Sequence, residues 1–136
     1  MGVVLIVGMH KYFVPMESPK PNHKNIKAGP HIFKLDNGNY GLLGFNNMIP
    51  VPECAIKSFD IDKEPNEKYR ELLKRQATII NRNKATILAH ASDTYYKVTN
   101  NTNKFLVGIS CDFLKLEKAS KQYDPNRKPI KTDRAE

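Results

Sequence analysis

The chain has 136 residues, of which 40% are hydrophobic and 26% are charged, so it is long and apolar enough to form a buried core. This composition excludes global disorder, and no apolar run approaches the ~20 residues of a membrane-spanning helix. The formal net charge of +8, from 22 Lys and Arg against 14 Asp and Glu, favours an anionic partner, most often nucleic acid. A basic surface without a partner is the alternative.

The first half of the chain is predicted to form strands and turns. Residues 3–8 (VVLIVG) are a continuous β-branched run, typical of a central strand buried on both faces. Residues 10–15 (HKYFVP) form a second predicted strand. A buried strand normally has a segment before it, and this one begins two residues after Met1. We therefore expect that the chain lacks part of its natural N-terminus.

A proline-rich loop over residues 17–30 separates these strands from a predicted β-hairpin. Asp36-Asn37-Gly38-Asn39 lies between two apolar runs, as a hairpin with positive-φ turn residues requires. Further short strands are predicted in NNMIPVP and CAIKSFDI, which together cover residues 46–61. Prolines interrupt the first of these segments and restrict it to a sheet edge or a bend.

The second half changes to helical periodicity. Asp62 or Asn66 can cap a first helix with Pro65 near its first turn, and Asn81 and Asn83 mark a predicted break before a second helix. The apolar residues at helical spacing are Tyr69, Leu72, Leu73, Ile80, Ile87, Ala91, Tyr95 and Val98, with Gln76 among them.

The C-terminal part is predicted as a strand, a helix and a tail. Residues 105–109 (FLVGI) form the predicted strand, and Ser110 or Asp112 can cap the last helix. We expect one domain over residues 1–122 and a disordered basic tail over residues 123–136. Strands followed by helices predict an α+β fold.

Cysteine and histidine usage argues against disulfide, zinc and metal-dependent chemistry. Cys54 and Cys111 lie in no paired-cysteine motif, and Cys111 is expected to be a small buried hydrophobe. The four histidines have spacings that no standard metal site uses, and His10, His31 and His90 are interpreted as structural. We therefore expect neither a metal nor a cofactor. Residues 2–7 lack the features of a signal peptide, so a cytoplasmic location is expected.

The segment ESPKPNH, residues 17–23, carries the groups that metal-free RNA cleavage needs. Such cleavage deprotonates the 2′-hydroxyl, stabilises a phosphorane and protonates the 5′-oxygen. Lys20 can contact a phosphate oxygen, Ser18 can donate a hydrogen bond, and either His23 or Glu17 can act as a base. By pattern alone, a solvated loop is the favoured interpretation of this segment.

Three blocks, in this order, are similar to the ToxN/AbiQ family of type III toxin–antitoxin endoribonucleases, and their divergence resembles the Cpt-like subfamily. They are MHKYFVPMESPKPNH (residues 9–23), FKLDNGNYGLLGFNNMIPVP (residues 33–52) and GISCDFLKLE (residues 108–117). The resemblance implies a strongly twisted antiparallel sheet flanked by helices, similar to Kid- and MazF-like toxins.

The resemblance also implies an activity and a partner. The activity is a metal-independent endoribonuclease that leaves a 2′,3′-cyclic phosphate and a 5′-hydroxyl and serves abortive infection in phage defence. The partner is a repeated RNA pseudoknot, which the toxin cuts from its precursor and which closes with the toxin into a protein–RNA assembly. Cellular RNA is the implied substrate.

Carried over residue by residue, the resemblance assigns Ser18 and Lys20 to the catalytic Ser-x-Lys of the family and His23 to the histidine that follows. Glu17 stands where better-known members have a threonine. A carboxylate there would repel the scissile phosphate, so Glu17 is expected to point away or to position Lys20. The family has a further lysine, and often a tyrosine, before the first strand, upstream of this chain's Met1.

Basic and aromatic side chains outside this segment are candidates for RNA contact. Tyr40, Phe45 or Tyr69 could stack on an unpaired base, although aromatic residues are more often part of a core. The predicted RNA-binding residues are Lys11, Lys24, Lys27, Arg82 and Lys84, each of which is otherwise an ordinary solvated charge.

Three classes of function remain open on the sequence. The first is the RNA-inhibited ribonuclease, the second is a catalytically weak RNA-binding module of the same fold, and the third is a structural or protein-binding role. Loss of cleavage with retained RNA affinity in Lys20→Ala or Ser18→Ala would favour the first. The third predicts no salt-dependent RNA binding.

Overall fold

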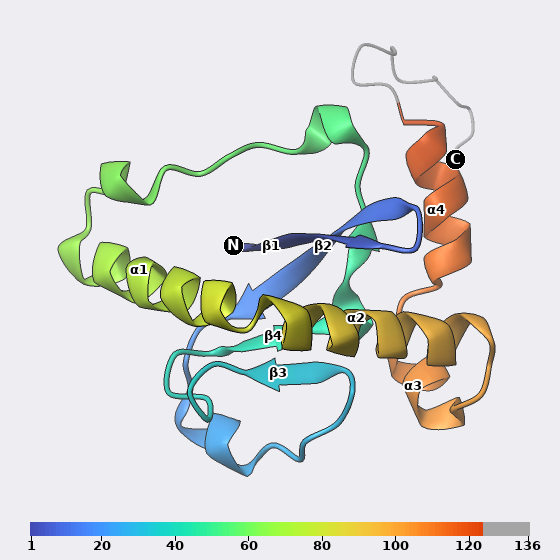
Figure 1. The fold of residues 1–136 in the computed structure, drawn as a ribbon, viewed down its shortest axis with the longest axis horizontal. Coiled ribbons are helices and arrows are strands. Elements are labelled where there is room, and N and C mark those ends of the chain that lie inside the picture. Colours follow the sequence, from blue (N-terminus) through green and yellow to red (C-terminus); the bar gives the residue numbers. More distant parts are fainter. Residues whose placement is uncertain (124–136) are drawn as a thin grey trace, which may run out of the picture.

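The computed structural model describes residues 1–123 and shows an α+β fold, as predicted: a five-stranded antiparallel sheet with four α-helices (Figure 1). The predicted tail over residues 123–136 lies outside the described residues, apart from Tyr123. The strands are β1 (Gly2–Val7), β2 (His10–Glu17), β3 (Ile32–Lys34), β4 (Leu42–Gly44) and β5 (Ile49–Pro50). The helices are α1 (Glu67–Arg82), α2 (Lys84–Thr99), α3 (Lys104–Ile109) and α4 (Phe113–Lys121).

Strand β2 organises the sheet because three other strands pair with it. The main strand order is β1-β2-β4-β3, and β5 also pairs with β2. The end of β2 pairs with β4 through Met16 and Leu43 and through Glu17 and Leu42. The backbone of Glu17 is therefore held by the last residue pair between β2 and β4, and the ESPKPNH segment begins at this residue.

The prediction that the first strand is central and buried on both faces is wrong. In the described part of the chain β1 pairs with β2 alone, at the sheet edge. Val4 and Ile6 are 40% and 63% exposed, whereas Val7 is buried, because alternate side chains of an edge strand face opposite sides.

The predicted β-hairpin is confirmed as β3 and β4, joined by the hairpin connection, residues 35–41. Asp36, Asn37 and Gly38 have φ angles of 51°, 54° and 90°, as their residue types predict. The predicted strand over residues 54–61 is wrong. The segment contains only short 3₁₀ turns, and Cys54 and Phe59 are exposed, so it has no buried face to pack on a sheet.

The helices begin and end where side-chain caps place them. Asn66 Oδ1 accepts a hydrogen bond from the Tyr69 backbone N–H, and Asp112 Oδ1 accepts one from the Lys115 N–H. Asn83 separates α1 from α2, as predicted. The predicted strand over residues 105–109 is wrong, because Asn103 caps this segment as helix α3 by accepting from the Leu106 N–H.

The core lies between the sheet and helices α2 and α4. Figure 1 shows α1 and α2 running nearly end to end across the sheet, with α4 beside the turn between β1 and β2. None of the helices within residues 1–123 is long and apolar enough to span a membrane. The core cluster contains Val7, Tyr12, Val14, Leu43, Phe45, Met48, Ile87, Ala91 and Phe113.

A buried carboxylate ties three elements of this core together. Glu117 Oε2 on α4 accepts hydrogen bonds from the Tyr12 hydroxyl on β2 (2.6 Å) and the Tyr95 hydroxyl on α2 (2.7 Å). The His10 Nε2 lies 3.5 Å from the other carboxylate oxygen. Burial, together with the bond to Glu117, raises the pKa of Tyr95 to about 12 and raises the pKa of Tyr12 further. We call Tyr12, Tyr95 and Glu117 the tyrosine–glutamate network.

Candidate active site

The ESPKPNH segment is shaped by the hairpin connection that packs against it. A Cβ at Gly41, where φ is +103°, would overlap the backbone carbonyl oxygen of Glu17. A Cβ at Gly38 would lie 2.8 Å from the Cβ of His23. Both positions therefore require glycine, since any side chain would push the connection away from the loop.

The loop turns sharply after its second proline. Pro21–Asn25 forms a 3₁₀ turn, and the His23 backbone N–H donates to the Lys20 carbonyl oxygen (3.0 Å). Pro21 fits the first turn because it has no N–H to satisfy. This turn directs His23 inward under the hairpin connection, where only 1% of the residue is exposed.

Glu17 occupies the middle of the site. Its Oε1 lies 3.7 Å from His23 Nε2 and 3.9 Å from Lys20 Nζ. The side chains of Glu17 and Lys20 are 53% and 62% exposed, so both can meet a ligand from solvent. Neither ring nitrogen of His23 has a hydrogen-bond partner within the described residues, although both are buried. Glu17 thus lies within salt-bridge distance of Lys20, and its role stays a prediction.

Ser18 is brought to the same loop but not into this cluster. It is exposed and follows Glu17 directly, before the turn that begins at Pro21. The structure thus collects three of the four predicted catalytic side chains, Glu17, Lys20 and His23, and leaves Ser18 at the rim. Their catalytic roles stay predictions.

The remaining histidines lie elsewhere in the fold. His10 faces Glu117, and His90 Nδ1 lies 3.1 Å from the Pro30 carbonyl oxygen. His31 was expected to be satisfied, but its buried Nδ1 has no partner in the described chain, and burial lowers its pKa. Within residues 1–123, no three His, Cys, Asp or Glu side chains are grouped so that they could hold a metal ion.

The predicted RNA-binding residues do not form one surface. Lys11 is ion-paired with Glu53, whereas Lys24 and Lys27 are exposed on the proline-rich loop. Arg82 and Lys84 are exposed where α1 meets α2. The Lys34 ammonium donates to the Lys24 carbonyl oxygen (3.2 Å), which holds this part of the loop against the hairpin.

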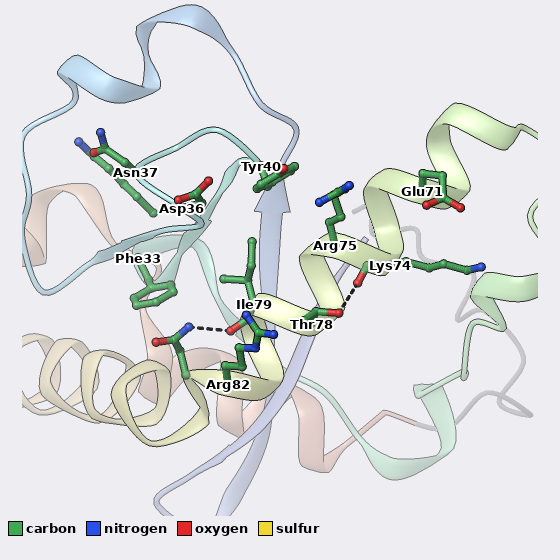
Figure 2. Close-up of a pocket in the computed structure, with 12 residues that line it drawn as sticks. Phe33, Asp36, Asn37, Tyr40, Glu71, Lys74, Arg75, Thr78, Ile79 and Arg82 are labelled. Atoms are coloured by element: carbon green, nitrogen blue, oxygen red, sulfur yellow. Dashed lines mark hydrogen bonds between the residues drawn. The ribbon is translucent and has the colours of Figure 1, made fainter.

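A cavity of about 760 Å³ lies on the other side of the hairpin connection, between that connection and α1 (Figure 2). Asp36, Asn37 and Tyr40 line it from the hairpin, and Arg75 and Arg82 line it from α1. Tyr40 and Arg82 are separate candidates for RNA contact in the sequence, and the structure brings both to this cavity. No local signal predicts this, because 41 intervening residues separate the two positions in the chain.

Comparison with known proteins gives consistent results. The family model "Toxin ToxN, type III toxin-antitoxin system" matches residues 1–121. The chain is 31% identical over 142 residues to the endoribonuclease ToxN of Bacillus thuringiensis subsp. kurstaki, covering 99% of this chain and 73% of that protein. It is 37% identical over 100 residues to the endoribonuclease ToxN of Pectobacterium atrosepticum, covering 69% of this chain and 58% of that protein.

Solved structures agree with the sequence relatives. A type III toxin structure, described as selectively inhibited by a non-coding RNA pseudoknot, superposes with a TM-score of 0.76 at 31% identity, over 90% of this chain and 77% of that one. The lactococcal anti-phage endoribonuclease AbiQ shares the fold, with a TM-score of 0.70 at 22% identity over 85% of this chain and 73% of that one. The family resemblance is confirmed, and the chain belongs to the ToxN family of type III toxin–antitoxin systems.

Proposed function

We propose that this chain is a metal-independent endoribonuclease toxin that acts through the loop of residues 17–23. The observation that carries the proposal is the Glu17 carboxylate placed between an exposed lysine and a buried histidine, at distances of 3.9 Å and 3.7 Å. Two relatives of this chain are named endoribonucleases, which supports RNA as its substrate.

The side chains of the loop differ in exposure, and this difference supports different catalytic roles for them. Glu17 is half exposed and can accept the proton of a 2′-hydroxyl, whereas His23 is too buried to contact RNA directly. His23 lies beside the Glu17 carboxylate without a hydrogen bond to it, so we assign His23 a positioning role and Glu17 the role of general base. Lys20 offsets the negative charge of Glu17 and contacts the scissile phosphate, while Ser18 donates a hydrogen bond to it.

The reaction is an intramolecular transesterification. The 2′-oxygen forms a bond to phosphorus as its proton passes to Glu17, and the bond from phosphorus to the 5′-oxygen breaks. The departing 5′-oxygen takes up a proton from solvent water, so the products are a 2′,3′-cyclic phosphate and a 5′-hydroxyl. Lys20 stabilises the extra charge on the phosphorane, which is greatest between bond formation and bond cleavage.

The partner that we propose is an antitoxin RNA. One related structure is described as inhibited by an RNA pseudoknot and another as part of an antiviral system regulated by a processed non-coding RNA. The +8 charge of this chain suits such a ligand. We therefore propose a repeated pseudoknot that the toxin cuts from its precursor, a closed protein–RNA assembly, a role in phage defence and a cytoplasmic location.

A catalytically weak RNA-binding module is the second candidate. The observation that favours it is Glu17 itself, because a carboxylate at the phosphate site repels the substrate unless Lys20 compensates. In that case Glu17→Thr would increase the rate of cleavage, whereas a general base at this position predicts that it lowers the rate.

The test is cleavage of a mixed RNA substrate in excess EDTA, with the new ends analysed by mass. The unchanged chain is expected to leave cyclic phosphate ends. Lys20→Ala should lower the rate of cleavage by about 10²- to 10³-fold. Lys118→Ala, an exposed lysine on α4, is the matched control and should keep full activity. RNA that stays intact, or linear 3′-phosphate ends formed at once, would contradict the proposal.

A further inference from the structure

We propose that the cavity between the hairpin connection and α1 is a nucleotide subsite that binds an unpaired base of single-stranded RNA next to the cleavage loop (Figure 2). The inference rests on the proposed ribonuclease function and adds a residue-level site to it. Tyr40 and Arg75 would hold the base, and Arg82 would contact a phosphate.

The position of the cavity follows from the packing of the hairpin connection. One side of the connection presses on the cleavage loop, where Gly38 meets His23 and Gly41 meets Glu17. The other side lines the cavity through Asp36, Asn37 and Tyr40. An RNA strand bound at Lys20 therefore reaches the cavity by crossing a single turn of the chain.

The Tyr40 ring and the Arg75 guanidinium form the recognition pair. The Arg75 Cζ lies 5.9 Å from the centre of the Tyr40 ring, close to the limit of a cation–π contact, and Figure 2 shows the two groups facing each other across the cavity. A base stacked between two planar groups needs about 7 Å, twice the van der Waals spacing. Arg75 is exposed, so a small movement of its side chain would admit the base.

The hairpin side of this pair is rigid. The buried Gln76 side chain donates from Nε2 to the backbone carbonyl oxygen of Tyr40 (2.9 Å), which fixes the hairpin connection to α1. Because this bond uses the main chain of Tyr40, replacement of the ring leaves it in place. A rigid platform reduces the entropy lost when a base is bound.

Four basic residues line the cavity against two acidic ones, Asp36 and Glu71, so its net charge is positive and suits RNA. Two of its four basic residues are already occupied: Lys74 lies 3.7 Å from Asp62, and Lys34 donates to a backbone carbonyl. In the part of the chain that the structure describes, Arg75 and Arg82 have no carboxylate partner within salt-bridge distance. They are seven residues apart on one face of α1, about 10 Å along its axis, so they can contact separate groups of one strand.

The first measurement is steady-state cleavage of a short RNA that contains one mapped cleavage site. Tyr40→Ala is expected to raise KM about 5- to 150-fold, the range for one stacked base, and Arg82→Ala is also expected to raise KM, with kcat within about threefold in both variants. Tyr40→Phe should keep the unchanged KM, because the phenyl ring still stacks. Tyr96→Ala, an exposed tyrosine on α2, and Lys118→Ala are matched controls that should have no effect.

The second measurement identifies the base. Lys20→Ala protein, which binds without turnover, is titrated with fluorescent RNAs that carry an abasic nucleotide at each position in turn. At one position near the cleavage site the abasic RNA should bind more weakly, and Tyr40→Ala should cause no further loss with that RNA.

Several results would overturn the subsite. One is an unchanged KM in Tyr40→Ala and Arg82→Ala, and another is a decrease in kcat alone in these variants. A third is that Tyr40→Ala weakens binding further with every abasic RNA, whichever position lacks its base. Adenosine monophosphate that binds as tightly as the oligonucleotide would identify a site for free nucleotides instead. An unchanged chain that neither cleaves nor binds RNA would instead refute the proposed function itself, so the two failures are distinct.

Discussion

Glu117→Ala should be among the most destabilising single changes in this fold. The carboxylate accepts hydrogen bonds from two hydroxyls in the core, at 2.6 Å and 2.7 Å, and joins β2, α2 and α4. A hydrogen bond to a charged group contributes about 1.5–3 kcal/mol, so loss of both should cost about 3–6 kcal/mol. Relief of carboxylate burial favours the lower end of that range.

Urea unfolding followed by circular dichroism measures this cost. Glu117→Gln keeps an oxygen that can accept both hydroxyls but loses the charge, so its cost should be about half. Glu67→Ala, an exposed glutamate at the start of α1, is the control and should cost at most about 1 kcal/mol. A shift below about 1 kcal/mol in Glu117→Ala, or equal shifts for Ala and Gln, would refute the reasoning.

Three further predictions concern pH and glycine. Because the pKa of Tyr95 is raised to about 12 and that of Tyr12 is also raised, stability should be complete below pH ~10 and should fall as the pH rises from ~10 to ~12, as urea midpoints in that range would show. Because the folded-state pKa of His31 is lowered, its contribution to stability should be present above pH ~6.5 and lost below it. The decrease in stability at acid pH should therefore be smaller in His31→Phe. Gly41→Ala should lower both stability and cleavage, because its Cβ overlaps Glu17, whereas Gly108→Ala, with open space around it, should be tolerated; equal effects in thermal melts would contradict this.

Elements defined by local chemistry could be predicted from the sequence. The hairpin follows from Asp36-Asn37-Gly38, whose positive φ angles suit those residue types, and α1 and α4 begin at the predicted Asn66 and Asp112 caps. Residues 105–109 were wrongly assigned to a strand because their β-branched character was given more weight than the Asn103 cap, which satisfies the first turn of a helix.

Features that depend on contacts between distant segments could not be predicted. The residue types of the ESPKPNH segment predict a candidate site, but the burial of His23 depends on Gly38, which follows 15 residues later. Tyr12 and Glu117 are 105 residues apart, and no spacing rule connects them. The edge position of β1 was missed because an apolar run alone does not show which faces are covered.

The glycine contacts at the hairpin connection also bear on when activity can arise during synthesis. The ESPKPNH segment leaves the ribosome before residues 38 and 41, the positions that press it into shape. Gln76, which anchors the connection to α1, is made later still. A nascent chain therefore carries the full motif long before it has a working site.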